Sequence, residues 1–293
     1  MRRLEVVAGP DSRELGVAQW GAADGVPVFL LHGTPGSRLG RHPHEDAVSG
    51  AGLRVITYDR PGYGASDRHA GRRVVDCAAD VAAIADALGI ETFFVSGGSG
   101  GGPHALAVAA RLAGRVVAAQ CVESGAPYDA VGLDFLAGMD PQNQREFGWA
   151  LHGEQTLHRE LAREAAEALA RMDADPAKLL SDDWQLDDSD RALLARTDLQ
   201  TVFQEMIREA VRPGVWGWVD DDLALVSPWG FDVTEIRVPV NVRYGEQDVL
   251  VPAAHGAWLA AHVPTARVQV SSESGHLTSP DDRLQQLVEL TNL

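Results

Sequence analysis

The chain has 293 residues, of which 45% are hydrophobic and 23% charged, the composition of an ordinary soluble globular protein with a full hydrophobic core. Its formal net charge of −17 argues against nucleic acid and anionic membranes as partners, because both are bound through clustered Lys and Arg. The first residues, MRRLEVV, lack the apolar stretch of a signal peptide, and no apolar run approaches the roughly 20 residues of a membrane span. We therefore expect a cytoplasmic protein that acts on a small-molecule substrate.

The first half of the chain alternates runs typical of strands with runs typical of helices. Apolar and β-branched runs predict strands, and apolar residues at helical spacing predict helices. This alternation indicates a mostly parallel sheet covered on both faces. The predicted strands are 4–8, 15–20, 26–31, 53–58, 92–95 and 116–122, the first two forming a hairpin, and the predicted helices are 72–88 and 104–112.

From about 128 to 235 the strands stop, and the composition predicts helices at 158–172 and 191–211. Residues 125–235 contain 23 of the 42 Asp and Glu but only 9 of the 25 Lys and Arg, and we interpret most of these charges as a solvated helical surface. Trp216 and Trp218 are candidates for lining a pocket, because an inserted helical segment with aromatic side chains is typical of a lid over an active site.

The alternation returns with predicted strands at 238–244 and 266–270 and predicted helices at 253–262 and 281–291. We therefore predict a core domain formed by residues 1–127 and 236–293, with a helical cap of residues 128–235 between its two parts. Cys77 and Cys121 fall in a predicted helix and a predicted strand, without neighbours at metal-site spacing. We expect two buried thiols in a reducing compartment, no metal and no cofactor.

A glycine-rich corner, GGSGG at 97–101, joins the strand predicted at 92–95 to the helix predicted at 104–112. In this context a Gly-x-Ser-x-Gly motif indicates a serine nucleophile, here Ser99. Glycines are needed because side chains would collide across so sharp a turn. The Gly100 amide would lie at a helix N-terminus, where it can stabilise an oxyanion. A phosphate-binding loop is the alternative, but no Lys follows at Walker spacing.

Four separated motifs resemble those of the α/β-hydrolase fold family and occur in the family's order. They are HGTPGS at 32–37, DRPGYGAS at 59–66, GGSGG at 97–101, and GEQD at 245–248 together with SGH at 274–276. The resemblance implies an eight-stranded, mostly parallel sheet with helices on both faces and an inserted helical cap. It also implies the order nucleophile, acid, histidine, which Ser99, Asp248 and His276 obey.

These three residues have complementary predicted roles. A serine hydroxyl needs a base within hydrogen-bond reach, and the imidazole of His276 can take the proton and return it to a leaving group. Asp248 would fix the tautomer of His276 and stabilise the imidazolium. Glu123 is an alternative acid, because it stands where certain haloalkane dehalogenases of the family keep theirs.

The resemblance further points to the backbone amide of Thr34 as a second oxyanion donor beside Gly100. It assigns His32 and Gly33 to the support of this oxyanion loop. The DRPGYG segment resembles a structural turn of the family, and we interpret it as scaffold.

Ser99 argues against dehalogenases and epoxide hydrolases of this fold, which attack with an aspartate. We therefore predict a serine hydrolase that cleaves a carboxylic ester of a small to medium neutral substrate through an acyl-enzyme. One alternative is a proline iminopeptidase-like aminopeptidase, suggested by the HG-x-PG form of the first motif but disfavoured by Gly100, where that family has a bulky aromatic residue. Cofactor-free perhydrolases and carbon–carbon bond hydrolases share the same residues. A non-hydrolytic ligand-binding protein of this fold is the alternative from another class.

Overall fold

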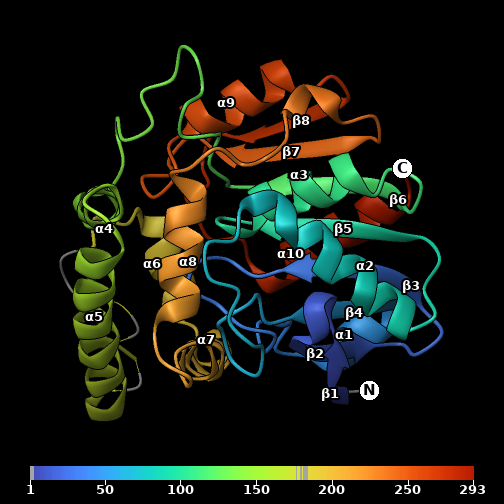
Figure 1. Ribbon diagram of the computed structural model, residues 1–293, viewed down its shortest axis with the longest axis horizontal. Helices are drawn as coiled ribbons and strands as arrows, with labels where there is room; N and C mark the ends of the chain where they lie inside the picture. Colours follow the sequence, from blue (N-terminus) through green and yellow to red (C-terminus); the bar gives the residue numbers. More distant parts are fainter. Residues whose placement is uncertain (1–2, 176, 179, 181–183) are drawn as a thin grey trace.

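The computed structural model describes residues 3–175, 177–178, 180 and 184–293, and the strands in this part of the chain form one sheet in the order β1-β2-β4-β3-β5-β6-β7-β8 (Figure 1). β2 pairs antiparallel with β1 and β4, whereas the other neighbouring strands are parallel. The eight-stranded, mostly parallel sheet is therefore confirmed. The strands are β1 (Arg3–Ala8), β2 (Glu14–Gly21), β3 (Val26–Leu31), β4 (Leu53–Tyr58), β5 (Phe93–Gly98), β6 (Val116–Val122), β7 (Val240–Gly245) and β8 (Ala266–Ser271).

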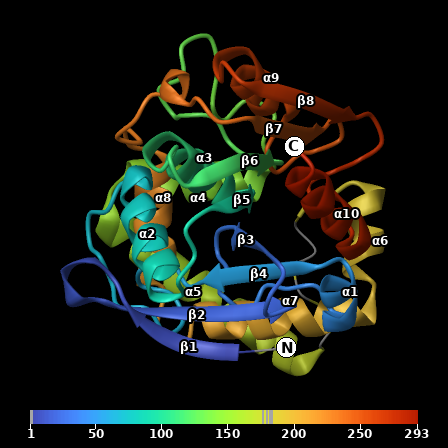
Figure 2. The ribbon, with the colours of Figure 1, turned by 90° about the vertical axis from the view of Figure 1, so that its right-hand side faces the viewer.

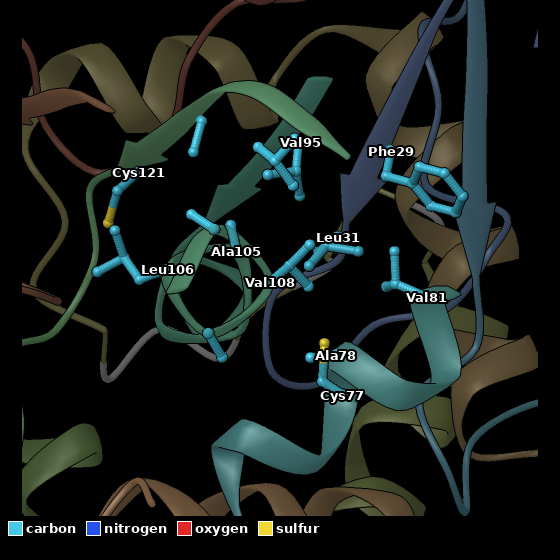
Figure 3. Packing of buried hydrophobic residues seen from close by; sticks show 14 of the residues in the cluster. Phe29, Leu31, Cys77, Ala78, Val81, Val95, Ala105, Leu106, Val108 and Cys121 are labelled. Carbon is cyan, nitrogen blue, oxygen red and sulfur yellow. The ribbon is translucent and has the colours of Figure 1, made fainter. Parts of the chain in front are cut away.

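Helices pack against both faces of the sheet and form two hydrophobic cores with it (Figure 2). Successive strand residues point to opposite faces, so Phe29 belongs to the first core and Val28 to the second. Figure 3 shows Leu106 and Phe29 within the first core. This core is covered by α2 (Cys77–Ala87), α3 (Gly101–Arg111) and α9 (Ala253–His262), and the second by α1 (Glu45–Gly50) and α10 (Pro280–Thr291).

Most predicted elements lie where the structure has them, with one clear exception, but the helices Glu45–Gly50, Pro141–Leu151 and Trp216–Leu225 were not predicted. The strands predicted at 26–31, 53–58 and 116–122 begin and end as predicted. The single helix predicted at 191–211 is wrong, because two helices occupy this segment. Between them Arg196 leaves the helical conformation, with φ −74° and ψ 121°, and its guanidinium pairs with Asp198 at 2.8 Å.

Among the residues that the structure describes, five α-helices lie between β6 and β7, and we call the segment between these strands the insert. Figure 1 shows them together at one end of the sheet. The expectation that the charges of the insert are solvated is wrong for Asp220, Asp221 and Asp222 of α8, which are at most 3% exposed because this helix is buried. The helices are α4 (Pro141–Leu151), α5 (Glu154–Ala174), α6 (Asp188–Leu194), α7 (Thr197–Ala210) and α8 (Trp216–Leu225).

Cys77 and Cys121 are buried free thiols, as expected from their predicted positions. None of the described helices is both long and apolar enough to cross a membrane. Within the same residues, no three His, Cys, Asp or Glu side chains gather closely enough to hold a metal ion.

Candidate active site

Ser99 occupies the corner between β5 and α3 with φ 52°, in the left-handed region that residues with a Cβ rarely adopt. Its amide donates to the carbonyl oxygen of Val122 at 3.0 Å, and its own carbonyl accepts from the Gly102 amide at 3.0 Å. A Cβ on Gly97 would lie 2.1 Å from the carbonyl oxygen of Gly101, so the corner requires glycine there. Backbone strain of this kind is concentrated at functional sites, where the surrounding structure maintains it.

His276 lies in the loop between β8 and α10, and it lines the same cavity as Ser99. Its Nδ1 is 2.8 Å from Oδ2 of Asp248, a carboxylate that is 4% exposed. Oδ1 of Asp248 accepts the amides of Leu250 and Val251 at 2.9 and 2.8 Å. These bonds orient the carboxylate toward Nδ1 of His276, so a neutral ring would carry its proton there and leave the lone pair of Nε2 free.

Glu123, the alternative acid, has a different partner. Its Oε2 accepts from the hydroxyl of Thr278 at 3.2 Å, whereas Nδ1 of His276 is bonded to Asp248. Burial raises the pKa of Glu123 to about 7, and the positive charges of Arg283 and His276 oppose that rise. The geometry therefore favours Asp248 as the acid that orients the histidine.

The loop after β3 packs against the Ser99 corner. A Cβ on Gly33 would lie 3.4 Å from Cβ of Ser99, and a Cβ on Gly100 would lie 3.2 Å from the amide nitrogen of Thr34. The backbones of Gly100 and Thr34 are thus neighbours beside Ser99. Two amides in this position could stabilise an oxyanion formed by attack of the serine.

His32 joins this loop to the turn after β4 through both ring nitrogens. Nδ1 is 2.7 Å from the carbonyl oxygen of Gly33, and Nε2 accepts the amide of Arg60 at 3.1 Å. Burial and the positive charge of Arg60 hold the pKa of His32 well below its usual range. A neutral ring with both nitrogens occupied can support the loop but cannot serve as the base.

Arg60 of the DRPGYG turn is fully buried and links the sheet to the insert through Asp221 of α8. Its Nε donates to Oδ1 of Asp221 at 3.0 Å, and Arg72 donates to the same oxygen at 2.6 Å. Asp221 also accepts from the hydroxyls of Thr34 and Tyr63, at 2.8 and 2.9 Å. Burial alone would raise the pKa of Asp221, but the two arginines hold it well below its usual range.

We expect Asp221→Asn to lower the free energy of unfolding by about 3–5 kcal/mol, because it leaves two buried guanidinium groups without a counter-charge. Urea unfolding followed by circular dichroism measures this loss. Glu154→Gln is the matched control, because its partner Arg68 is partly exposed and the pair contributes below about 1 kcal/mol. Equal losses in the two variants would contradict a special role for the buried network.

A cavity of about 480 Å³ lies between the sheet and the insert, with Ser99 and His276 in its wall. Most of the wall is apolar, with a smaller number of polar side chains among them, which is the usual character of a small-molecule site. Apolar residues of the wall include Trp20, Leu30, Val48 and Val55 from the sheet side and Leu186, Leu199, Val202, Phe203 and Met206 from the insert.

The two tryptophans predicted as pocket candidates lie in different places. Trp218 lines the large cavity, and its Nε1 donates to Glu146 at 2.7 Å. Trp216 is two residues earlier on α8 and therefore about 200° around the helix. The Trp216 ring packs against the ring of His158, with the two ring centroids 4.1 Å apart. The guanidinium of Arg68 lies over the same Trp216 ring. We therefore remove Trp216 from the pocket candidates.

Glu146 and Asp222 are neighbouring carboxyl groups, of which Asp222 is buried and Glu146 half-buried. Both line a small cavity of about 60 Å³ together with Ser99 and Gly100. Burial raises the pKa of Glu146 to about 7, and burial and the charge of Glu146 raise the pKa of Asp222 well above its usual range. Both shifts favour the protonated forms of the two side chains.

The comparison with protein families identifies the fold family. The family whose description is alpha/beta hydrolase fold matches residues 26–282. The chain belongs to this family. The motif resemblance found in the sequence is thereby confirmed, and the family supports a hydrolase.

Relatives of this alpha/beta hydrolase carry several activities in their names. It is 28% identical to a non-heme chloroperoxidase from Streptomyces lividans, over 87% of its own chain and 86% of the relative's. It is also 28% identical to a 2-hydroxymuconate semialdehyde hydrolase from Pseudomonas putida, over 91% and 86% of the two chains. A thermophilic esterase from Thermogutta terrifontis shares the fold, with a TM-score of 0.70, 21% identity and 99% and 98% of the chains covered.

Sequence reasoning about this alpha/beta hydrolase missed the contributions of the insert, namely Glu146, Asp221 and Asp222. A run of three aspartates is ordinarily a solvated surface, and the partners of Asp221 lie far away in the chain. One signal was available. Apolar residues surround the run on both sides, as in WGWVDDDLALV, which is typical of a helix buried all round.

Proposed function

We propose that this protein is a serine hydrolase that cleaves a carboxylic ester of a small to medium neutral substrate through an acyl-enzyme. The observation that supports it best is the arrangement of Ser99 at a strained corner and His276, oriented by Asp248, in the wall of one cavity. We further propose that the insert acts as a cap over this cavity, because it supplies much of the apolar wall.

The proposed reaction has two acyl-transfer steps. Nε2 of His276 takes the proton of the Ser99 hydroxyl as the oxygen attacks the ester carbonyl. The resulting oxyanion would be stabilised by the amides of Gly100 and Thr34, and the alcohol would leave with the proton from His276. Water, activated by the same imidazole, then cleaves the acyl-enzyme and restores Ser99.

The substrate class follows from the wall of the cavity. A mainly apolar space of about 480 Å³ accommodates aliphatic or aromatic groups on either side of the ester, and burial of those groups would supply most of the binding free energy. A series of p-nitrophenyl esters of increasing acyl length, assayed with lactones and peptides alongside, tests this preference. Covalent labelling of Ser99 by a fluorophosphonate probe tests the nucleophile, and an unlabelled Ser99 in the folded protein would refute the proposal.

The rate of hydrolysis is expected to increase with pH up to about 9. Burial alone would lower the pKa of His276, but the charge and hydrogen bond of Asp248, with help from Glu123 and Asp190, raise it to about 9. The imidazole must be neutral to accept the Ser99 proton, so kcat/KM should increase as pH rises through this pKa. The pH profile of kcat/KM for p-nitrophenyl acetate measures it, and a profile already flat at neutral pH would contradict it.

A second candidate is an aminopeptidase-like activity, and the Glu146–Asp222 pair favours it. These carboxyl groups share a small cavity with Ser99, and a cationic amino group bound beside them would favour their ionised forms and pair with them. Turnover of proline naphthylamide compared with p-nitrophenyl acetate separates the two candidates. A preference for the amide that disappears in Glu146→Gln would favour the aminopeptidase.

A further inference from the structure

The loop that carries His276 is held by the insert as well as by Asp248. Three successive backbone amides of this loop donate to side chains at the start of α6. The Gly275 amide donates to the hydroxyl of Ser189 at 3.2 Å, and the amides of His276 and Leu277 donate to the two carboxylate oxygens of Asp190 at 2.9 and 2.7 Å. Three consecutive hydrogen bonds thus hold the His276 loop against the start of α6.

Asp190 is fully buried, with an exposed fraction of 0%, so water does not compete for its carboxylate oxygens. Burial, and to a lesser degree the neighbouring Asp187, raise its pKa to about 6, whereas the amides of His276 and Leu277 that donate to the carboxylate oppose that rise. Hydrogen bonds from amides to a charged carboxylate are stronger than those between neutral groups. Gly275 shows how close the approach is, because a Cβ there would lie 1.7 Å from Oδ2 of Asp187.

We propose that Asp190 is a positioning residue that fixes the backbone of His276, so that the insert forms part of the catalytic centre. This inference rests on the proposed role of His276 as the base. Asp248 fixes the rotation of the imidazole through Nδ1, whereas Asp190 fixes the position of the backbone from which the ring extends. Both constraints are needed because a displacement of about 1 Å can reduce a reaction rate about 10²-fold.

Coupling of this kind makes catalysis depend on the docking of α6. If the insert moved away from the loop, three amides would lose their acceptors and the base would lose its fixed position. The proposal therefore predicts that disturbing Asp190 lowers kcat more than it changes KM, because Asp190 lines neither described cavity.

Asp190→Asn tests the proposal, with Asp188→Asn as the matched control. Asp188 is on the same helix and loses the same charge, but its side chain is exposed. We expect Asp190→Asn to lower kcat for p-nitrophenyl acetate by about 10²-fold with KM little changed. The control should retain the wild-type kcat. Equal kcat values in the two variants would overturn the proposal.

Proton NMR gives a second readout that needs no substrate. The Nδ1 proton of a histidine bonded to a carboxylate resonates far downfield, and we expect Asp190→Asn to broaden or remove this signal while Asp188→Asn retains it. Three carboxylates face His276 from different elements, namely Asp248 after β7, Glu123 after β6 and Asp190 on α6, with Arg283 of α10 near Glu123. Loss of one negative charge should therefore also lower the pKa of the ring.

These readouts separate this proposal from the proposed function. A wild-type protein that hydrolyses no ester would refute the function, yet the NMR comparison would still decide whether Asp190 positions the ring. An unchanged downfield signal in Asp190→Asn would overturn the positioning role. If Asp190→Asn does not fold, Ser189→Ala removes the acceptor of the Gly275 amide, together with the hydrogen bond that the Ser189 hydroxyl donates to Asp187 at 2.6 Å. A lower kcat at unchanged thermal stability would then support the proposal, and an unchanged kcat would overturn it.

Discussion

Replacing Ser99 by alanine is expected to lower kcat for ester hydrolysis by roughly 10⁶-fold, the scale observed when the nucleophile of a serine hydrolase is removed. Without the hydroxyl, His276 has no proton to accept and no acyl-enzyme can form. The two amides next to the corner remain, so a small residual rate above that of water is expected. Stopped assays with a p-nitrophenyl ester measure the loss.

A second substitution at this position separates chemistry from folding. Ser99→Gly should be as inactive as Ser99→Ala but more stable than it by about 1 kcal/mol, because glycine adopts a positive φ without the strain of a Cβ. Thermal unfolding of the two variants measures the difference. Substantial activity in either one would show that another group attacks the substrate.

Asp248→Asn is expected to lower kcat by on the order of 10⁴-fold. An asparagine could still accept the amides of Leu250 and Val251 through its oxygen, but it would present an NH₂ group to Nδ1 of His276. The imidazole would then carry its proton on Nε2 and could not take one from Ser99. Steady-state kinetics at the pH of maximal activity measure this loss.

Glu123→Gln is the control for the choice of acid. Because Glu123 bonds Thr278 rather than Nδ1 of His276, we expect its loss to change kcat little. It should move the pH profile toward lower pH, since one negative charge near the imidazole disappears. If Glu123→Gln were the more damaging of the two substitutions, Glu123 would be the orienting acid.

The sheet was predictable because its signals are local. Runs such as VPVFLL and LRVITY combine apolar and β-branched residues between turn signals, and they become β3 and β4 with the predicted bounds. The break between α6 and α7 was not predictable in the same way. Ala195 and Arg196 interrupt the helix without a glycine or proline, so only the conformation of the folded chain reveals it.

The same distinction applies to the candidate site. Ser99, Asp248 and His276 each sit in a short motif with recognisable neighbours, and their order along the chain relates them to one another. Asp190 and Asp221 have no motif. Their partners are 86 and 161 residues away in the chain. The sequence alone therefore does not distinguish an aspartate that is exposed to water from one that binds a buried partner.

The way the insert is joined to the sheet has a consequence for protein engineering. β6 and β7 are parallel neighbours, so the chain between them is a crossover loop whose ends are fixed by the pairing of the two strands. Doubling the length of such a loop adds only about 0.6 kcal/mol of closure entropy. A foreign segment of quite different size could therefore be grafted between the strands at small energetic expense. The graft would have to bring its own carboxylate for Arg60 and Arg72, or both arginines would need replacement at the same time.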